Sequence, residues 1–199
     1  DVCSSDLNGV KREHLELKNF IEGLKHFKEE IEKDEVALMA LEVALINCGE
    51  KVEVIKDFEN AYNLNFPKLS AAGGTPLGQA IELAVKSLSE RKELYNQSGI
   101  QYYQPMLVLM TDGFATDDTS NAINLVKNLC NNRKLTVVNI AIGNSADCET
   151  LKKFHPNNEV TTINKLEMKD FFRWLSESVK VVSNNNGERI TKSYNDWNQ

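Results

Sequence analysis

Two short apolar runs separated by a helical pattern constrain the fold of this chain more than any other feature. Residues 106–110 are wholly apolar and residues 135–142 nearly so, and each run has the length of one strand. Such strands are typical of the centre of a parallel sheet, where both faces are covered. Apolar residues at helical spacing lie between the two runs. This alternation predicts an α/β fold with a doubly wound, mostly parallel sheet flanked by helices on both faces.

The rest of the chain continues the alternation of helical and strand patterns. Apolar residues three and four positions apart predict helices, and short apolar or alternating runs predict strands. We expect strands 40–48 and 52–58 to form a hairpin and residues 59–74 to form a loop. The other expected elements are helices over 9–33, from Thr75 onward, from Asp118 or Thr119 onward, over 147–154 and over 165–182, and a strand over 160–163.

Thr75 and Asp112 are the candidate ligands of a metal ion. Thr75 follows a glycine turn, and Asp112 directly follows the apolar strand 106–110 and Thr111. Hydroxyl and carboxylate oxygens suit a hard divalent cation, and ligands of doubly wound sheets bind beyond the carboxyl ends of strands. Two simpler roles stay open at this point. Thr75 is also placed to cap the helix that begins there, and Asp112 to form a turn before Gly113.

The segments 73–78 (Gly-Gly-Thr-Pro-Leu-Gly) and 107–113 (Leu-Val-Leu-Met-Thr-Asp-Gly) together resemble the metal-ion-dependent adhesion site (MIDAS) of a von Willebrand factor A (vWA) domain. The resemblance implies a Rossmann-like vWA fold that binds partners and is not an enzyme. It implies that Thr75 and Asp112 help to hold Mg²⁺ or Mn²⁺, and that an acidic group of the partner takes an open position on the ion.

The beginning of the chain departs from the family pattern. A vWA domain normally opens with an apolar strand that ends in Asp-x-Ser-x-Ser-Met-x-Gly and supplies the main ligands. If Gly9 is the glycine of this motif, Val2 stands at the aspartate, Ser4 at the first serine and Asp6 at the second. Ser4 and Asp6 are therefore carried over as further candidate metal ligands. The metal prediction is conditional on an intact N-terminal loop.

Residues 1–7 are interpreted as an artefactual or a degenerate start, because they resemble the read-through translation of a common sequencing adapter. The first central strand of the sheet is then expected to be missing. Residues 8–184 are expected to form the vWA domain, and residues 185–199 a polar C-terminal tail.

Several segments resemble one bacterial branch of the family, the TerY/YegL-like group associated with tellurium resistance and stress operons. The segments are 44–47, 52–58, 73–78, 91–95, 99–105, 111–118 and 172–176. The branch implies a cytoplasmic, non-enzymatic module that binds an acidic or phosphorylated protein. Two alternatives stay open: a metal-independent scaffold with a degenerate site, and a Rossmann-like metal-dependent hydrolase that would use Asp112.

Composition narrows the classes of partner. The 199 residues carry 23 Lys and Arg against 29 Asp and Glu, a net charge of −6. A mildly acidic chain argues against general nucleic-acid binding, and no apolar stretch is long enough to span a membrane. The four cysteines are scattered without metal-binding spacing, which favours a reducing compartment. Composition leaves the oligomeric state open.

Overall fold

A computed structural model describes residues 3–66, 69, 73–143, 146–164 and 167–184, with side chains described from Leu17 onward. In chain order, the elements are α1 (Cys3–Ile31), α2 (Glu35–Ala40), β1 (Glu42–Cys48), β2 (Val52–Asn60), the 3₁₀ turn η1 (Ala61–Asn63), α3 (Leu77–Gln97), β3 (Met106–Thr111), α4 (Ser120–Asn131), β4 (Thr136–Ile142), α5 (Cys148–Phe154), β5 (Thr161–Ile163) and α6 (Met168–Asn184). The predicted tail 185–199 lies outside the described residues.

The strands form two hydrogen-bonded groups. β1 and β2 pair as an antiparallel hairpin, while β3, β4 and β5 form a parallel sheet in that order. β1 and β3 belong to different groups and are not hydrogen-bonded neighbours. The predicted hairpin and the predicted parallel sheet are therefore both confirmed, but the sheet is divided between β1 and β3.

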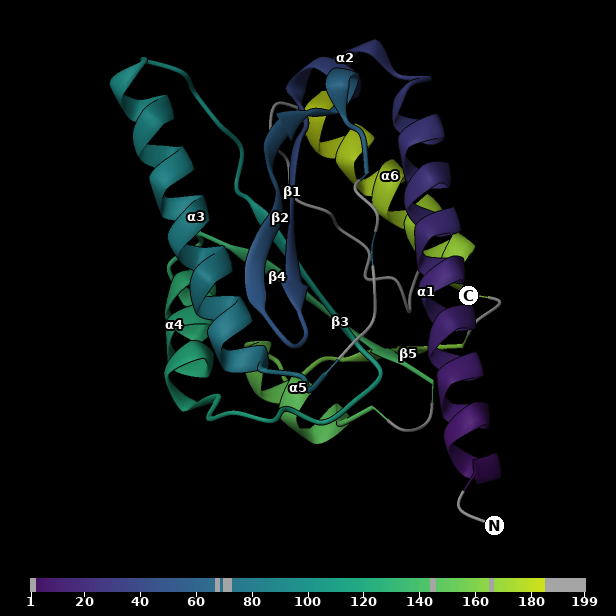
Figure 1. Cartoon of the computed structure of the whole chain (residues 1–199). Coiled ribbons are helices and arrows are strands. Elements are labelled where there is room, and N and C mark those ends of the chain that lie inside the picture. Colours follow the sequence, from purple (N-terminus) through teal and green to yellow (C-terminus); the bar gives the residue numbers. More distant parts are fainter. Residues whose placement is uncertain (1–2, 67–68, 70–72, 144–145, 165–166, 185–199) are drawn as a thin grey trace.

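Alternation along the strands assigns the helices to two faces. Met106, Val108 and Met110 of β3 pack into one apolar core with α1 and α6, whereas Leu107 and Leu109 pack into a second core with α3, α4 and α5. Successive side chains of a strand point to opposite faces, so the sheet has helices on both sides, as the sequence predicts (Figure 1).

Aromatic side chains anchor α6 to α1. Phe171 and Phe172 are buried, and Phe172 contacts the rings of Phe20 and Phe27. At Gly23, a β-carbon would lie 2.3 Å from the ring of Phe172, so only glycine allows the helices to come this close. The aromatic side chains of α6 therefore face the core. Within the described residues, no helix is long and apolar enough to cross a membrane.

The structure corrects three local predictions. Residues 35–40 form the short helix α2, whose first turn is capped by Asp34. The predicted loop 59–74 contains the end of β2 and the turn η1. Helix α1 begins at Cys3 rather than Gly9, so residues 4 and 6 lie in a helix and not in a loop. Preferences for helix or strand that are read from one segment leave out the tertiary contacts, which can override them.

Candidate functional site

Three segments meet where β3 ends. They are the tip of the β1–β2 hairpin, the turn before α3 and the loop after β3. A β-carbon at Gly73 would lie 2.8 Å from Glu50 Cα, and one at Gly74 would lie 3.0 Å from Thr116 Oγ1. The Thr116 N–H also donates a hydrogen bond to the Thr75 carbonyl (2.9 Å). Side chains larger than hydrogen at these glycines would force the segments apart.

Thr75 and the residue after Asp112 lie side by side. A β-carbon at Gly113 would lie 3.2 Å from Thr75 Oγ1, so the threonine hydroxyl faces the first turn after β3. Thr75 and Asp112 are both partly buried. The Gly113 carbonyl accepts a hydrogen bond from the Asp147 N–H (3.3 Å), which ties the same turn to the start of α5. The two predicted ligands are thus brought to one edge of the sheet, although 37 positions separate them in the sequence.

Thr75 does not cap helix α3, so that alternative is wrong. The residue before the helix is Pro76, which makes no side-chain cap hydrogen bond. Asp117 caps the helix instead, because its carboxylate accepts from the N–H groups of Gly78 (3.0 Å) and Gln79 (2.8 Å). A β-carbon at Gly78 would lie 2.5 Å from the Asp118 carbonyl oxygen, so glycine is needed for this contact. The loop after β3 is therefore fixed to the start of α3.

Asp117 and Asp118 both act through backbone hydrogen bonds. Asp118 accepts from the Ser120 N–H (2.9 Å) at the start of α4. Hydrogen bonds from Ser120 hold the pKa of the Asp118 carboxyl below its ordinary value. The residue before α4 is Thr119, which makes no side-chain cap hydrogen bond, so Asp118 supports the start of this helix from one position further back. Sequence reasoning missed only that Asp117 caps α3, a helix that begins 40 positions earlier in the chain.

Cys48 marks the end of β1 at the same edge. Burial, together with the negative charge of Asp117, raises the pKa of the Cys48 thiol to about 11. Cys48 packs against the same apolar core as Leu77 at the start of α3 and Ala115 in the loop after β3. The carboxyl ends of β1 and β3 and the beginning of α3 therefore lie at one end of the molecule (Figure 1).

The described residues supply an incomplete set of metal donors. They contain no group of three or more His, Cys, Asp and Glu side chains able to hold a metal ion. Thr75 and Asp112 offer two oxygens of the kind that Mg²⁺ accepts, but Mg²⁺ requires six ligands, some of them water. Ser4 and Asp6 lie in the first turns of α1, and their side chains are outside the described residues. The donor chemistry therefore fits one part of a hard-cation site.

Comparison with known proteins places these observations in a family. A family model described as "von Willebrand factor type A domain" matches residues 17–174. No curated protein sequence matches the chain significantly.

Solved structures of proximal thread matrix protein 1 from the mussel byssus share the fold. Two of them match with a TM-score of 0.57 at 15% and 16% identity, and each alignment covers 81% of this chain. A third, described as having a zinc-occupied MIDAS motif, matches with a TM-score of 0.54 at 15% identity over 81% of this chain. The chain spans 42–43% of the length of these mussel chains. At such low identity the likeness extends to the fold alone.

Proposed function

The chain belongs to the von Willebrand factor type A domain family, and on this premise we propose that it is a protein-interaction module with a metal-ion-dependent adhesion site. In this proposal, Thr75 and Asp112 contribute oxygen ligands to Mg²⁺ or Mn²⁺. The partner contributes a carboxylate or a phosphate to the same ion.

One observation carries the proposal: the Thr75 hydroxyl lies against Gly113, the residue after Asp112, beyond the carboxyl end of β3. This edge is where doubly wound sheets bind their ligands. Since Asp117 caps α3, Thr75 is not occupied as a cap. The two hydrogen bonds that Asp117 accepts from Gly78 and Gln79 also hold the Thr75 turn and the Asp112 turn together before any ion binds. This reduces the entropy lost when the two turns are ordered on binding.

A bound cation would attract a negatively charged group of the partner, while the ligands from this chain would fix the position of the cation. Asp112 and Thr75 alone leave most of the positions on a Mg²⁺ ion to water and other groups. Ser4 and Asp6 remain candidates for additional ligands, but from the first turns of α1 and not from the loop that the resemblance implies.

A metal-independent scaffold is the second candidate function. It is favoured by the small donor set of the described residues, which lack a cluster of three or more metal-binding side chains. A metal-dependent hydrolase is less well supported, because the neighbouring carboxylates of Asp117 and Asp118 already accept backbone hydrogen bonds.

Paramagnetic Mn²⁺ tests the metal site directly. In NMR spectra of the full chain, we expect Mn²⁺ to broaden the amide signals of Thr75, Asp112 and Gly113 first. Asp112→Asn should remove this selectivity, whereas Asp57→Asn, at an exposed position on β2, should leave it unchanged. Uniform broadening over all acidic surfaces would overturn the metal site and leave the scaffold as the better explanation.

Partner chemistry is tested on immobilised peptides. An array of acidic, phosphorylated and neutral peptides is probed with the full chain in Mg²⁺ and in EDTA. We expect acidic or phosphorylated peptides to retain the chain only in Mg²⁺, and Asp112→Asn to lose the retention. Equal retention with and without chelator would contradict metal-dependent recognition.

We further propose that residues 8–184 form this interaction domain, with residues 185–199 as a polar tail. The proposed setting is a bacterial cytoplasmic stress or tellurium-resistance system of the TerY/YegL type. This part rests on the sequence resemblance. It is tested by tellurite sensitivity of a deletion strain, complemented by the wild-type chain but not by Asp112→Asn.

A further inference from the structure

Helices α3 and α4 end in the same hydrogen-bond pattern, which closes a helix with one residue in the left-handed conformation. At the end of α3, the Gly99 N–H donates to the Asn96 carbonyl (3.2 Å). The next N–H, of Ile100, donates to the Tyr95 carbonyl (2.8 Å). Gly99 supplies the left-handed residue with a φ of +66°, a conformation that glycine adopts without strain.

An arginine takes the glycine position at the end of α4. The Arg133 N–H donates to the Cys130 carbonyl (3.0 Å), and the Lys134 N–H donates to the Leu129 carbonyl (2.8 Å). Arg133 has a φ of 56°, and this conformation strains any residue that has a β-carbon. Strained residues of this kind gather at functional sites. The exposed Arg133 side chain therefore requires an explanation beyond the closing of the helix.

Lys92 of α3 connects this helix end to an exposed tyrosine. Its ammonium group donates to the Lys134 carbonyl (2.8 Å) and lies 5.8 Å from the centre of the Tyr102 ring. The Tyr102 ring also packs against the ring of Tyr95, with 5.7 Å between the two centres. Tyr102 is nevertheless 41% exposed. The ring is thus held in position by α3 while a large part of it faces the solvent.

These side chains form a basic–aromatic patch, which consists of Lys92, Tyr102, Arg133 and Lys134. Within the described residues, no carboxylate forms an ion pair with its three cations. Glu93, the neighbour of Lys92 in the sequence, accepts instead from the Gln97 amide (3.0 Å). Burial and the positive charge of Lys134 lower the pKa of Lys92. In a chain with a net charge of −6, the patch thus has the opposite sign and lacks counter-charges.

The helix dipole offers a simpler explanation for part of this charge. Cations near the end of a helix stabilise its negative pole, and Lys134 lies just after α4, whose last turn has no basic residue. The dipole does not explain Arg133, because glycine at this position would close the helix with less strain. A basic residue within the last turn would serve the dipole equally well.

We infer that the basic–aromatic patch binds an acidic segment of a partner protein that carries one large apolar side chain. The cations attract the carboxylates of the segment, and the exposed part of the Tyr102 ring contacts its apolar side chain. Tyrosine and arginine are enriched among the residues that dominate binding at protein interfaces. The inference goes beyond the proposed function and does not rest on it, because the patch requires no metal ion.

The patch lies at the end of the sheet opposite to Thr75 and Asp112. The Thr136 N–H at the start of β4 donates to the Pro105 carbonyl (2.9 Å), so the segment after α3 adjoins the beginning of β4. β3 and β4 are parallel, and Asp112 follows the other end of β3. In Figure 1 the end of α3 lies at the top and its beginning near the bottom. The two sites are therefore separate.

Fluorescence anisotropy of labelled peptides tests the inference on the full chain. EDTA is present throughout, to remove any contribution of the metal edge. The probes have the sequence Glu-Asp-Glu-X-Glu-Asp-Glu, where X is Phe, Leu or Ser. We expect the Phe and Leu probes to bind, and the Ser probe to bind about fivefold more weakly or less, because it buries no large apolar side chain. Failure of both apolar probes to bind, or equal binding of all three, would overturn the inference.

Charge reversal locates the site on the surface. Lys134→Glu should weaken binding of the Phe probe about tenfold, because it replaces an attraction by a repulsion. Lys169→Glu changes the net charge equally at an exposed position of α6 and should leave the affinity nearly unchanged. Equal weakening by both variants would mean that only the overall charge matters, which would overturn the inference.

The aromatic contact has its own matched pair of variants. Tyr102→Ala should weaken binding of the Phe probe about fivefold, whereas Tyr62→Ala, at an exposed tyrosine of η1, should not. Unchanged binding by Tyr102→Ala would overturn the role of the ring and with it the inferred ligand. A single-stranded oligouridylate that binds more tightly than the Phe probe would also overturn it, since cations beside an aromatic ring suit nucleic acids too.

Arg133→Gly separates binding from folding. Glycine removes the strain and the charge together, so the melting temperature should rise by about 2 °C while binding of the Phe probe weakens about fivefold. A lower melting temperature would show that Arg133 serves the fold and would contradict the inference. Asp112→Asn should bind the Phe probe in EDTA like the wild type. Loss of binding in that variant would place the probe at the metal edge, so the patch and the metal site can fail independently.

Discussion

β4 and β1 are apolar strands of equal length with very different environments. β4 has a parallel partner on each edge, and Val137, Ile140 and Ala141 are buried. In the part of the chain that the structure describes, β1 has one partner, β2, and all seven of its residues are only partly buried. Apolar composition alone therefore does not bury a strand, because a strand also needs neighbours on both edges.

Polar contacts differ between the two regions in the same way. Asn139 in β4 is buried, and its amide donates to the carbonyls of Leu151 (2.8 Å) and Glu159 (3.1 Å). Around β1, the polar anchor lies at the beginning of the strand, where Glu42 bonds to Arg91 and Tyr95 of α3. The middle of β1 carries no such buried polar anchor among the described contacts.

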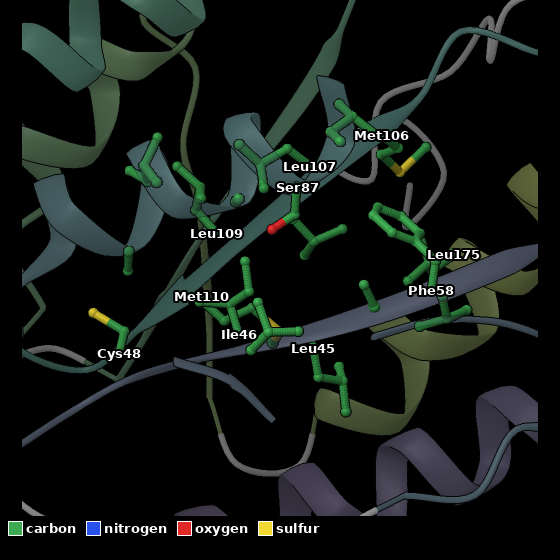
Figure 2. Close-up of a pocket in the computed structure, with 18 of the residues that line it drawn as sticks. Leu45, Ile46, Cys48, Phe58, Ser87, Met106, Leu107, Leu109, Met110 and Leu175 are labelled. Atoms are coloured by element: carbon green, nitrogen blue, oxygen red, sulfur yellow. The ribbon is translucent and has the colours of Figure 1, made fainter. Parts of the chain in front are cut away.

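The largest expected effect compares one residue type in both regions. Ile140→Ala removes a side chain that is 0% exposed, and we expect a loss of about 3–4 kcal/mol in unfolding free energy. Ile46 lines an apolar cavity of about 350 Å³ between β1 and β3 (Figure 2). Ile46→Ala should cost about 1–2 kcal/mol, because fewer contacts are lost around a space that is already open. Guanidinium unfolding of both variants measures the difference. Equal losses would mean that the cavity closes in solution.

The next effect concerns the cap that fixes the site. Asp117→Ala leaves the N–H groups of Gly78 and Gln79 without their carboxylate, and we expect a loss of about 1–2 kcal/mol. Asp117→Asn should recover part of it, because an amide oxygen still accepts. Asp118→Ala is the matched control and should cost less than about 1 kcal/mol, since it removes one exposed turn hydrogen bond. Urea unfolding of the variants checks the order of these losses in free energy. A larger loss for Asp118→Ala than for Asp117→Ala would contradict the role of Asp117 in joining the loop after β3 to α3.

The predictable part of the fold follows from local periodicity. The patterns of β3, β4, α4 and α6 are strong and short in range, so the α/β class and most elements could be predicted. The cap of α3 could not, because Asp117 is distant in the sequence and no spacing connects it to Gly78. The helix α2 was missed for a related reason: its six residues merge with the apolar pattern of β1.

The site was predictable only in its location. The sequence places Thr75 before a helix and Asp112 after a strand, and topology alone brings such positions to one edge of the sheet. Whether they bind a metal remains a prediction. The division of the sheet between β1 and β3 is a property of strand pairing, and the apolar pattern of neither strand reveals it. Only the family resemblance, which leaves the first central strand missing, predicts a gap in the sheet.

A smaller effect, dependent on pH, comes from the anchor at the start of β1. The Arg91 Nε donates to Glu42 Oε2 at 2.7 Å, and Tyr95 also donates to this carboxylate. Burial acts in the opposite direction, but the hydrogen bonds from Arg91 and Tyr95 leave the pKa of Glu42 below its ordinary value of 4.5. A lowered pKa stabilises the fold above 4.5, and this contribution is lost as the pH falls through the folded-state pKa.

We therefore expect Glu42→Gln to cost about 1 kcal/mol at pH 7 and to weaken the acid dependence of stability below pH 4.5. The control is Glu90→Gln on the same helix as Arg91. Glu90 forms an exposed pair with Lys86, whose side chains are 67% and 71% exposed, so this change should be nearly neutral. Unfolding at several pH values measures both, and identical acid profiles for wild type and Glu42→Gln would contradict the anchor.

The smallest effect concerns the reactivity of Cys48 at the carboxyl end of β1, and it involves no change in stability near pH 7. With the pKa of Cys48 at about 11 against an ordinary 9.0, its reactive thiolate at pH 8 is about a hundredfold rarer than that of an ordinary thiol. In a chain whose other three cysteines are serine, alkylation of Cys48 should be slower by about that factor when folded than in urea.

Because the pKa of Cys48 is raised in the folded state, the contribution of this thiol to stability is complete below pH 9 and is lost between pH 9 and about 11. Asp117→Ala should speed the folded reaction by removing the nearby negative charge. A folded rate close to the rate in urea would show that β1 opens at this end without unfolding β4, which would make the contrast between the two strands dynamic as well as structural.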